Sequence, residues 1–112
     1  MSDCLFCRIA AGEIPSDRVL EDDEIIAFRD ISPRAPTHVL VIPRRHVADL
    51  QSLTDADADL AAALFRGVRE VASNAGLRSY RVVSNVGAEA GQSVDHLHLH
   101  VLGGRPMSWP PG

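Results

Sequence analysis

The chain has 112 residues, 46% of them apolar, and a formal net charge of −4. This composition predicts one globular domain over residues 1–112 and argues against a disordered or collagen-like chain. No apolar run is long enough to cross a bilayer, and residues 1–9 do not resemble a secretory signal, so we expect a cytoplasmic protein with no membrane partner. The acidic balance argues against nucleic acid as a partner, although a local pocket could hold one phosphate.

A helix, a hairpin and a further strand are predicted in the first half of the chain. The spacing of apolar residues predicts a short helix over 3–11, which the following glycine can end. Residues 18–21 and 25–29 have the β-branched content of strands and flank an acidic turn, so we expect a hairpin. A loop with prolines over 31–36 then leads to a strand over 38–43.

The second half contains the clearest element, a helix of about 20 residues. Thr54 and Asp57 approximate a capping box at its start, and Gly76 follows its end. Apolar residues recur at helical spacing at Leu60, Leu64, Val68, Val71, Ala72 and Ala75. Two strands are predicted over 80–84 and 94–102. Because strands and helices do not alternate regularly, we predict an α+β fold, a five-stranded antiparallel sheet with a short N-terminal helix and one long helix.

Three histidines alternate with apolar residues over 96–101. Since the side chains of a strand point alternately to its two faces, His96, His98 and His100 should line one face while the apolar residues enter the core. Imidazoles titrate near neutrality and can act as nucleophiles, proton carriers or donors to an anion. His38 is predicted on a neighbouring strand, which favours a phosphate site over the alternatives, a solvated polar face or an adventitious metal patch.

The segment 91–105, Gly-Gln-Ser-Val-Asp-His-Leu-His-Leu-His-Val-Leu-Gly-Gly-Arg, resembles the signature of the histidine triad (HIT) proteins. The resemblance extends over nearly the whole chain, including 30–33, 36–43 and 109–112. Residues 103–107 resemble the Hint-like branch of nucleoside phosphoramidases. The third histidine of the motif is His100, where nucleotidyltransferase relatives would have glutamine, so the resemblance favours a hydrolase.

This resemblance implies hydrolysis of purine nucleoside 5′-phosphoramidates, which releases a nucleoside monophosphate and an amine or ammonia. His98 matches the nucleophile, whose neutral imidazole would form a nucleotidyl-histidine that water then cleaves. We expect a backbone carbonyl to hold its other ring nitrogen. His100 and His38 match the histidines that contact phosphate or relay protons. Ser93 matches the residue that assists departure of the amine, or it is a loop hydroxyl bonded to nearby backbone.

Other positions match residues that bind the nucleotide. Asp30 corresponds to the acid that grips the ribose hydroxyls, for which two carboxylate oxygens are suited; the alternative is an Asx turn. The residues matching the purine walls and the contacts near the phosphate are Phe6, Ile9, Phe28, Ile31, Leu40, Asn85, Gly91 and Gln92, together with His98 and His100. Each apolar residue among them could equally be ordinary core.

Four residues form a candidate metal site: Cys4, Cys7, His46 and His96. Two thiolates and two imidazoles suit a tetrahedral structural zinc. The resemblance supports zinc, because many bacterial members of the family carry it at this set. In the competing interpretation, the cysteines are small buried residues of the first helix and His46 binds backbone. We expect structural zinc and no catalytic metal.

Other functions remain open at this point. A zinc hydrolase could use His96, His98 and His100 as an open site, but alternate Cα atoms of a strand lie about 7 Å apart, which strains such a site. Dinucleoside polyphosphate hydrolysis and non-catalytic, regulatory nucleotide binding are further alternatives. The small domain and the resemblance also imply a homodimer, with the exposed part of the long helix in the interface.

Overall fold

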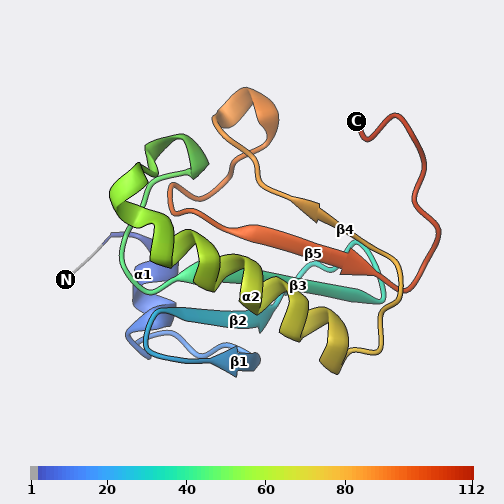
Figure 1. The fold of residues 1–112 in the computed structure, drawn as a ribbon, viewed down its shortest axis with the longest axis horizontal. Helices are drawn as coiled ribbons and strands as arrows, with labels where there is room; N and C mark the ends of the chain where they lie inside the picture. The colour runs from blue at the N-terminus through green and yellow to red at the C-terminus, as the bar shows by residue number, and fades with distance from the viewer. Residues whose placement is uncertain (1–2) are drawn as a thin grey trace.

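An antiparallel sheet of five strands, in the order β1-β2-β3-β5-β4, is the framework of the computed structural model, which describes residues 3–112 (Figure 1). The strands are β1 (Arg18–Glu21), β2 (Ile25–Arg29), β3 (Thr37–Pro43), β4 (Tyr80–Val83) and β5 (Leu99–Gly103). The helices are α1 (Leu5–Ala10) and α2 (Ala58–Asn74), with short 3-10 turns at Leu50–Ser52, Asp55–Asp57 and Ala88–Ala90. The predicted α+β architecture is confirmed. Within residues 3–112, neither helix has the length and apolar character needed to span a membrane.

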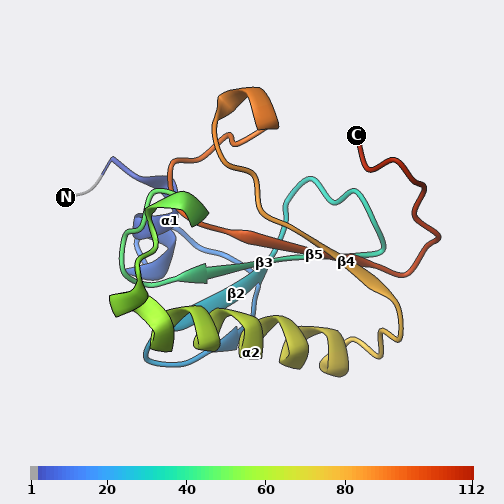
Figure 2. The same ribbon diagram turned by 45° about the horizontal axis from the view of Figure 1, so that its top comes forward.

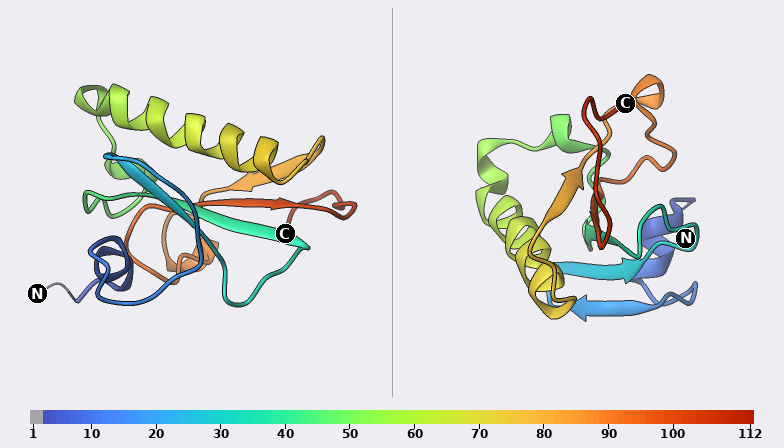
Figure 3. Two further views of the ribbon diagram at one scale, coloured as in Figure 1. Left: turned by 90° about the horizontal axis from the view of Figure 1, so that it is seen from below. Right: turned by 90° about the vertical axis from the view of Figure 1, so that its right-hand side faces the viewer.

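The long helix α2 covers one face of the sheet (Figure 3). It buries the predicted stripe in the main core, which consists of Ile25, Ala27, Val39, Val41, Val47, Leu60, Ala63, Leu64, Val68, Val71, Leu97, Leu99 and Val101. Gly67 permits this close packing, since a Cβ there would lie 2.7 Å from Cδ1 of Ile25. The predicted capping box is present, because Asp57 accepts a hydrogen bond of 2.9 Å from the Thr54 backbone N–H. The first turn is a 3-10 turn, however, so α2 itself begins at Ala58.

Helix α1 and the loops that precede β3 and β5 lie on the other face of the sheet (Figures 2 and 3). A second apolar cluster fills the space between α1 and β2 and β3, and it consists of Phe6, Ile9, Ile26, Phe28, Leu40 and Ile42. The sheet therefore has one face devoted to packing α2 and another that combines a smaller core with loops.

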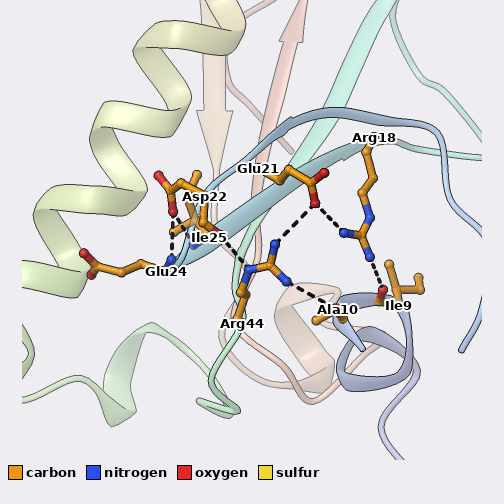
Figure 4. Close-up of polar contacts among 8 residues, drawn as sticks. All are labelled: Ile9, Ala10, Arg18, Glu21, Asp22, Glu24, Ile25 and Arg44. Carbon is orange, nitrogen blue, oxygen red and sulfur yellow. Dashed lines mark hydrogen bonds and ion pairs between the residues drawn. The ribbon is translucent and has the colours of Figure 1, made fainter. Parts of the chain in front are cut away.

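Two arginines fix the C-terminal end of α1 to the β1–β2 hairpin (Figure 4). Arg18 donates to the carbonyl of Ile9 at 2.7 Å, and Arg44 donates to the carbonyl of Ala10 at 3.3 Å. Both guanidinium groups also bind the carboxylate of Glu21, at 2.6 and 3.3 Å. The last carbonyls of a helix have no partner within it, so these bonds satisfy them while holding the helix in place.

The last strand is shorter than the predicted 94–102, because β5 begins at Leu99. Extending the β3–β5 register would pair Leu97 with Pro43. Proline has no N–H to donate, so the ladder stops, and the Leu97 N–H donates to the carbonyl of Val47 instead. The hairpin strands have the predicted bounds, and α1, β3 and β4 agree within two residues.

The face of β4 on the α2 side is uncovered. Val82 pairs with the buried Val101, which places it on that side of the sheet, yet the side chains of Val82 and Tyr80 are exposed. Phe65 of α2 is exposed as well. These apolar residues next to an open sheet edge are expected to be covered by a second copy of the chain. Val82→Asp should therefore convert a dimer into a monomer in analytical ultracentrifugation at micromolar concentration.

Leu5→Asp is a matched control for this experiment. Leu5 is also an exposed apolar residue, but it belongs to α1 on the opposite side of the sheet. Its substitution should leave the dimer intact. A wild-type chain that sediments as a monomer would contradict the expected homodimer.

Candidate functional site

The structure gathers three predicted catalytic histidines and the predicted ribose-binding acid in one site: His38, His98, His100 and Asp30. His38 lies on β3, His100 on β5, His98 directly before β5 and Asp30 directly after β2. The ring centroids of His98 and His100 are 5.0 Å apart, and those of His38 and His100 are 5.1 Å apart. Phe6 of α1 contacts His98 edge-on, with ring centroids 5.1 Å apart, so the site lies on the α1 side of the sheet.

The ring of His98 is held by the main chain, as expected. Its Nδ1 lies 2.7 Å from the carbonyl oxygen of His96. A carbonyl oxygen can only accept, so the Nδ1 atom carries the proton and donates it. The unshared electron pair of His98 is therefore on Nε2. With only 5% of the residue exposed, the ring has a fixed tautomer and little freedom to turn.

The tautomer of His38 is the opposite one, because a backbone donor and not an acceptor faces its Nδ1. The backbone N–H of Arg34 donates to Nδ1 of His38 at 3.0 Å, so the His38 proton is on Nε2. This Nε2 lies 2.9 Å from Nδ1 of His100 and 3.5 Å from Oδ2 of Asp30. The short contact makes His38 the donor and His100 the acceptor, which puts the His100 proton on Nε2. A main-chain N–H thus begins a directed chain of hydrogen bonds through two imidazoles.

The electrostatic environment keeps both of these rings neutral. Burial, and after it the positive charge that His98 and His38 can carry, lower the pKa of His100 to about 4, while Asp30 opposes the shift. Burial also lowers the pKa of His38, against the effect of the Asp30 carboxylate. Because both pKa values lie below the ordinary 6.5, the two rings can serve as neutral donors and acceptors near pH 7.

The Asx turn predicted as the alternative for Asp30 is present, and its ribose-binding role stays a prediction. Its Oδ1 accepts a hydrogen bond from the Ser32 backbone N–H at 2.8 Å, which is an Asx turn. Its Oδ2 lies 3.5 Å from Nε2 of His38.

Four of the apolar residues predicted to form the purine walls are buried together in the second cluster, namely Phe6, Ile9, Phe28 and Leu40. Ile31 is not among them, since 99% of its surface is exposed.

The predicted phosphate loop is braced by Gln92. Its Oε1 accepts from the Gly87 N–H at 2.9 Å, and its Nε2 donates to the carbonyls of Ala48 and Val94 at 2.8 and 3.1 Å. The side chain of Gln92 therefore shapes the loop, and the backbone N–H groups of Gly91 and Gln92 donate within it, to the carbonyls of Ala88 and Gly87 at 3.0 and 3.1 Å. Nearby, Asn85 packs close to Gly91, where a Cβ would lie 3.8 Å from Asn85 Nδ2.

Ser93 is exposed, and the structure places it on a groove that it shares with the candidate metal site. The groove is lined by Asp3, Cys4, Leu5, His46, Ser93, Val94 and Asp95. The structure does not record a hydrogen bond between Ser93 and the described residues of the triad. Its role toward the leaving group therefore stays a prediction.

The four predicted metal ligands lie together, with their ligand atoms within 4.8 Å of one another. Nδ1 of His96 is 3.4 Å from Sγ of Cys4 and 3.5 Å from Sγ of Cys7, and Nδ1 of His46 is 3.2 Å from Sγ of Cys7. Two such ligands of one tetrahedral zinc would lie about 3.6 Å apart, given ordinary Zn–S and Zn–N bond lengths. The donor set thus fits a metal ion, and His46 meets a thiol instead of the backbone.

Two further contacts prepare this site for a metal. The Nε2 of the fully buried His96 lies 2.8 Å from the carbonyl of Pro43, so it donates there and leaves Nδ1 to face the thiols. The Cys7 backbone N–H donates to Sγ of Cys4 at 3.4 Å, which orients this sulfur. Burial lowers the pKa of His96, against the effect of its bond to Pro43, and so favours the neutral ring that a metal needs.

These contacts disfavour a metal shared by the three alternating histidines. His96 is engaged at both ring nitrogens with Pro43 and the cysteines, and Nδ1 of His98 is engaged by the His96 carbonyl. His100 faces His38. The three rings therefore bind different partners and do not converge on one point where a metal ion could lie.

Comparison with known proteins identifies the family. The HIT domain matches residues 11–107. An uncharacterized HIT-like protein from Synechocystis is 49% identical over 98% of this chain and 97% of its own length, and one from Synechococcus elongatus is 47% identical with the same coverage. The crystal structure of a HIT family hydrolase from Legionella pneumophila is 51% identical, with a TM-score of 0.96 over 98% of this chain and 100% of that chain. A HIT family hydrolase from Clostridium thermocellum is 39% identical, with a TM-score of 0.93 and coverage of 96% of each chain.

The chain belongs to the HIT family. Within that family it is a hydrolase-like protein, since solved structures of HIT family hydrolases share its fold over nearly their whole length.

The pKa of His100 generates a prediction for stability. The folded value, about 4, is below the ordinary 6.5, so the unfolded chain binds this proton more readily. The stabilisation by neutral His100 is fully present above pH 6.5 and is lost as the pH falls toward 4. Urea unfolding at several pH values should show a steeper loss of unfolding free energy for the wild type than for His100→Gln. Equal slopes would contradict a buried, neutral His100.

Proposed function

We propose that this protein hydrolyses the P–N bond of purine nucleoside 5′-phosphoramidates, with His98 as the nucleophile. The observation that carries the proposal is the hydrogen bond from Nδ1 of His98 to the His96 carbonyl. It places a ring proton on Nδ1 and leaves Nε2 as the nitrogen whose electron pair can attack phosphorus. The family membership supports hydrolysis, and His100 at the third position of the motif agrees with it.

In the first step, Nε2 of His98 attacks the α-phosphorus and forms a P–N bond to the ring. The bond between phosphorus and the amine breaks, and its electron pair leaves with the amine nitrogen, which needs a proton. In the second step, water attacks phosphorus and gives up one proton, which replaces the proton that the protein gave to the amine. The bond to His98 breaks, and its electron pair returns to Nε2. This sequence divides one difficult displacement into two easier ones.

The other histidines supply donors around the phosphate. The hydrogen-bond chain from Arg34 through His38 leaves the Nε2–H of His100 as its terminal donor. A neutral imidazole donor next to the nucleophile can hold an equatorial phosphate oxygen without neutralising the attacking electron pair. We assign protonation of the departing amine to Ser93, whose exposed hydroxyl lies in the loop before the triad.

The nucleoside side of the substrate is assigned to Asp30 and the apolar residues beside it. Oδ1 of Asp30 already accepts from the Ser32 N–H. We therefore assign the contact with the ribose hydroxyls to Oδ2. Phe6 borders His98, and it packs against Phe28 with ring centroids 5.5 Å apart. A flat purine suits the surface of such an aromatic pair.

We also propose that the four-residue metal site holds structural zinc. Cys4, Cys7, His46 and His96 provide the thiolate and imidazole donors that zinc prefers. When bound, zinc supplies no reaction step but fastens α1 to the segment that carries the triad. The catalytic chemistry stays with the histidines.

His98→Asn should abolish hydrolysis of adenosine and guanosine 5′-phosphoramidates. We expect kcat to fall by on the order of a thousandfold, which is about 4 kcal/mol in the barrier at about 1.4 kcal/mol per factor of ten. The measurement is product analysis by chromatography with purified protein. Binding of the nucleoside monophosphate, measured by calorimetry, should be largely retained because Asn stays polar and its amide N–H can still donate to the His96 carbonyl.

Two outcomes distinguish the alternatives. Cleavage of diadenosine polyphosphates in preference to phosphoramidates would favour the polyphosphate hydrolase, and nucleotide binding without any turnover would favour a regulatory binding protein. Wild-type turnover in His98→Asn would contradict the assignment of the nucleophile.

Freshly purified, untagged protein should contain about one zinc per chain by elemental analysis. The double substitution of Cys4 and Cys7 by serine should remove the zinc and lower the urea midpoint, because metal binding is coupled to folding. His98→Asn is the matched control, since it alters a histidine two positions from His96 without removing a metal ligand. Well under one zinc per chain in the wild type would contradict the proposal.

A further inference from the structure

We propose that Arg105 is a positioning residue for His38, acting through the backbone of Arg34. Arg105 follows β5 on the exposed surface. Its guanidinium donates twice to the Arg34 carbonyl, from Nε at 3.0 Å and from Nη2 at 2.8 Å. The catalytic consequence rests on the proposed function, whereas the positioning itself concerns only the ring of His38.

The guanidinium holds the residue whose N–H sets the His38 tautomer. Arg34 uses its carbonyl to accept from Arg105 and its N–H to donate to Nδ1 of His38 at 3.0 Å. The orientation of that N–H depends on the backbone of the loop over 31–36. Holding the Arg34 carbonyl from outside the loop therefore fixes the direction of the bond that reaches the ring.

The loop has little else to hold it at this point. Of residues 31–36, only Ala35 is buried. Pro33 and Pro36 have no N–H to donate. The bond from the Ser32 N–H to Asp30 secures the beginning of the loop, but Arg34 lies two residues further on.

The glycine before Arg105 places it beside the loop. Gly104 has φ +93°, a conformation that favours glycine, and a Cβ there would lie 2.9 Å from Cβ of Pro36. The backbone after β5 can therefore run directly against Pro36. A third bond, from Nη1 of Arg105 to the Pro106 carbonyl at 3.0 Å, orients the guanidinium toward Arg34.

The contact between Arg105 and the Arg34 carbonyl differs from an ordinary ion pair of a surface arginine. Exposed guanidinium groups paired with carboxylates contribute little to stability. Here the acceptor is a main-chain carbonyl, and two N–H groups of one planar group meet it. Loss of the contact should leave the sheet intact, because Asp30 and His38 are also joined by a backbone bond of 2.9 Å.

Without Arg105, the Arg34 N–H is no longer directed at His38. The ring can then move its proton to Nδ1 and present Nε2 as an acceptor. The contact with Nδ1 of His100 would lose its donor, and the hydrogen-bond chain to the phosphate would be interrupted. The nucleophile His98 would be unaffected, because its tautomer is set by the His96 carbonyl.

The test compares Arg105→Met, Arg105→Lys and a control, Arg78→Met, which removes another exposed arginine. Long-range nitrogen–proton NMR at pH 8 reports the tautomer of each neutral histidine. We expect His38 to carry its proton on Nε2 in the wild type and the control, and to populate the Nδ1–H form in Arg105→Met. Arg105→Lys keeps a charged group that can donate to the Arg34 carbonyl, and it should restore part of the wild-type pattern.

The kinetic readout is a fall in kcat of about tenfold in Arg105→Met, with KM changed by less than about threefold, since the ribose-binding acid keeps its place. An unchanged His38 tautomer in Arg105→Met would overturn the proposal, whatever the activity. So would a kcat equal to that of the control on any substrate the wild type turns over. The NMR result needs no substrate, so it decides the positioning role even if the protein is not a phosphoramidase.

Discussion

The site depends on the position where the β3–β5 ladder stops. Pro43 has no N–H, so the chain before Leu99 leaves the sheet, and two carbonyls become available to side chains. The Pro43 carbonyl accepts from His96 and turns the other nitrogen of that ring toward the cysteines. The His96 carbonyl accepts from His98 and leaves its Nε2 free. One missing donor in a strand thus orients a candidate metal ligand and the proposed nucleophile.

Main-chain groups decide which ring nitrogen carries the proton in each of the three proposed catalytic histidines. A carbonyl fixes His98, and an amide N–H fixes His38, whose donor then sets His100. Backbone groups cannot exchange donor for acceptor, so this pattern is more robust than one built from side chains alone. Helix α1 completes the arrangement. It contributes Phe6 to the face of the proposed catalytic histidines and, together with its N-cap, the two cysteines of the candidate metal site, while Arg18 and Arg44 hold its far end.

The sequence predicts what depends on local periodicity. Alternation over 96–101 correctly places Leu97, Leu99 and Val101 in the core, and helical spacing locates the buried stripe of α2. The resemblance to the HIT family also predicted which residues form the candidate metal site and which histidines lie together. The start of β5, the bracing role of Gln92 and the contacts of Arg34 and Arg105 could not be predicted, because they depend on which distant backbone groups meet after folding. The Gly-Gly-Arg segment at 103–105 could be recognised in the sequence. The reason for its second glycine, close contact with Pro36, is apparent only in the folded chain.

The central claim is that His98 attacks phosphorus through Nε2, the nitrogen left free by the His96 carbonyl. The most direct measurement is to quench the wild-type protein during turnover of adenosine 5′-phosphoramidate and to locate the nucleotidyl group by fragmentation mass spectrometry and NMR. The account predicts an adenylyl group on His98, bonded to Nε2. An adduct bonded to Nδ1, or one on His96 or His100 instead, would contradict it.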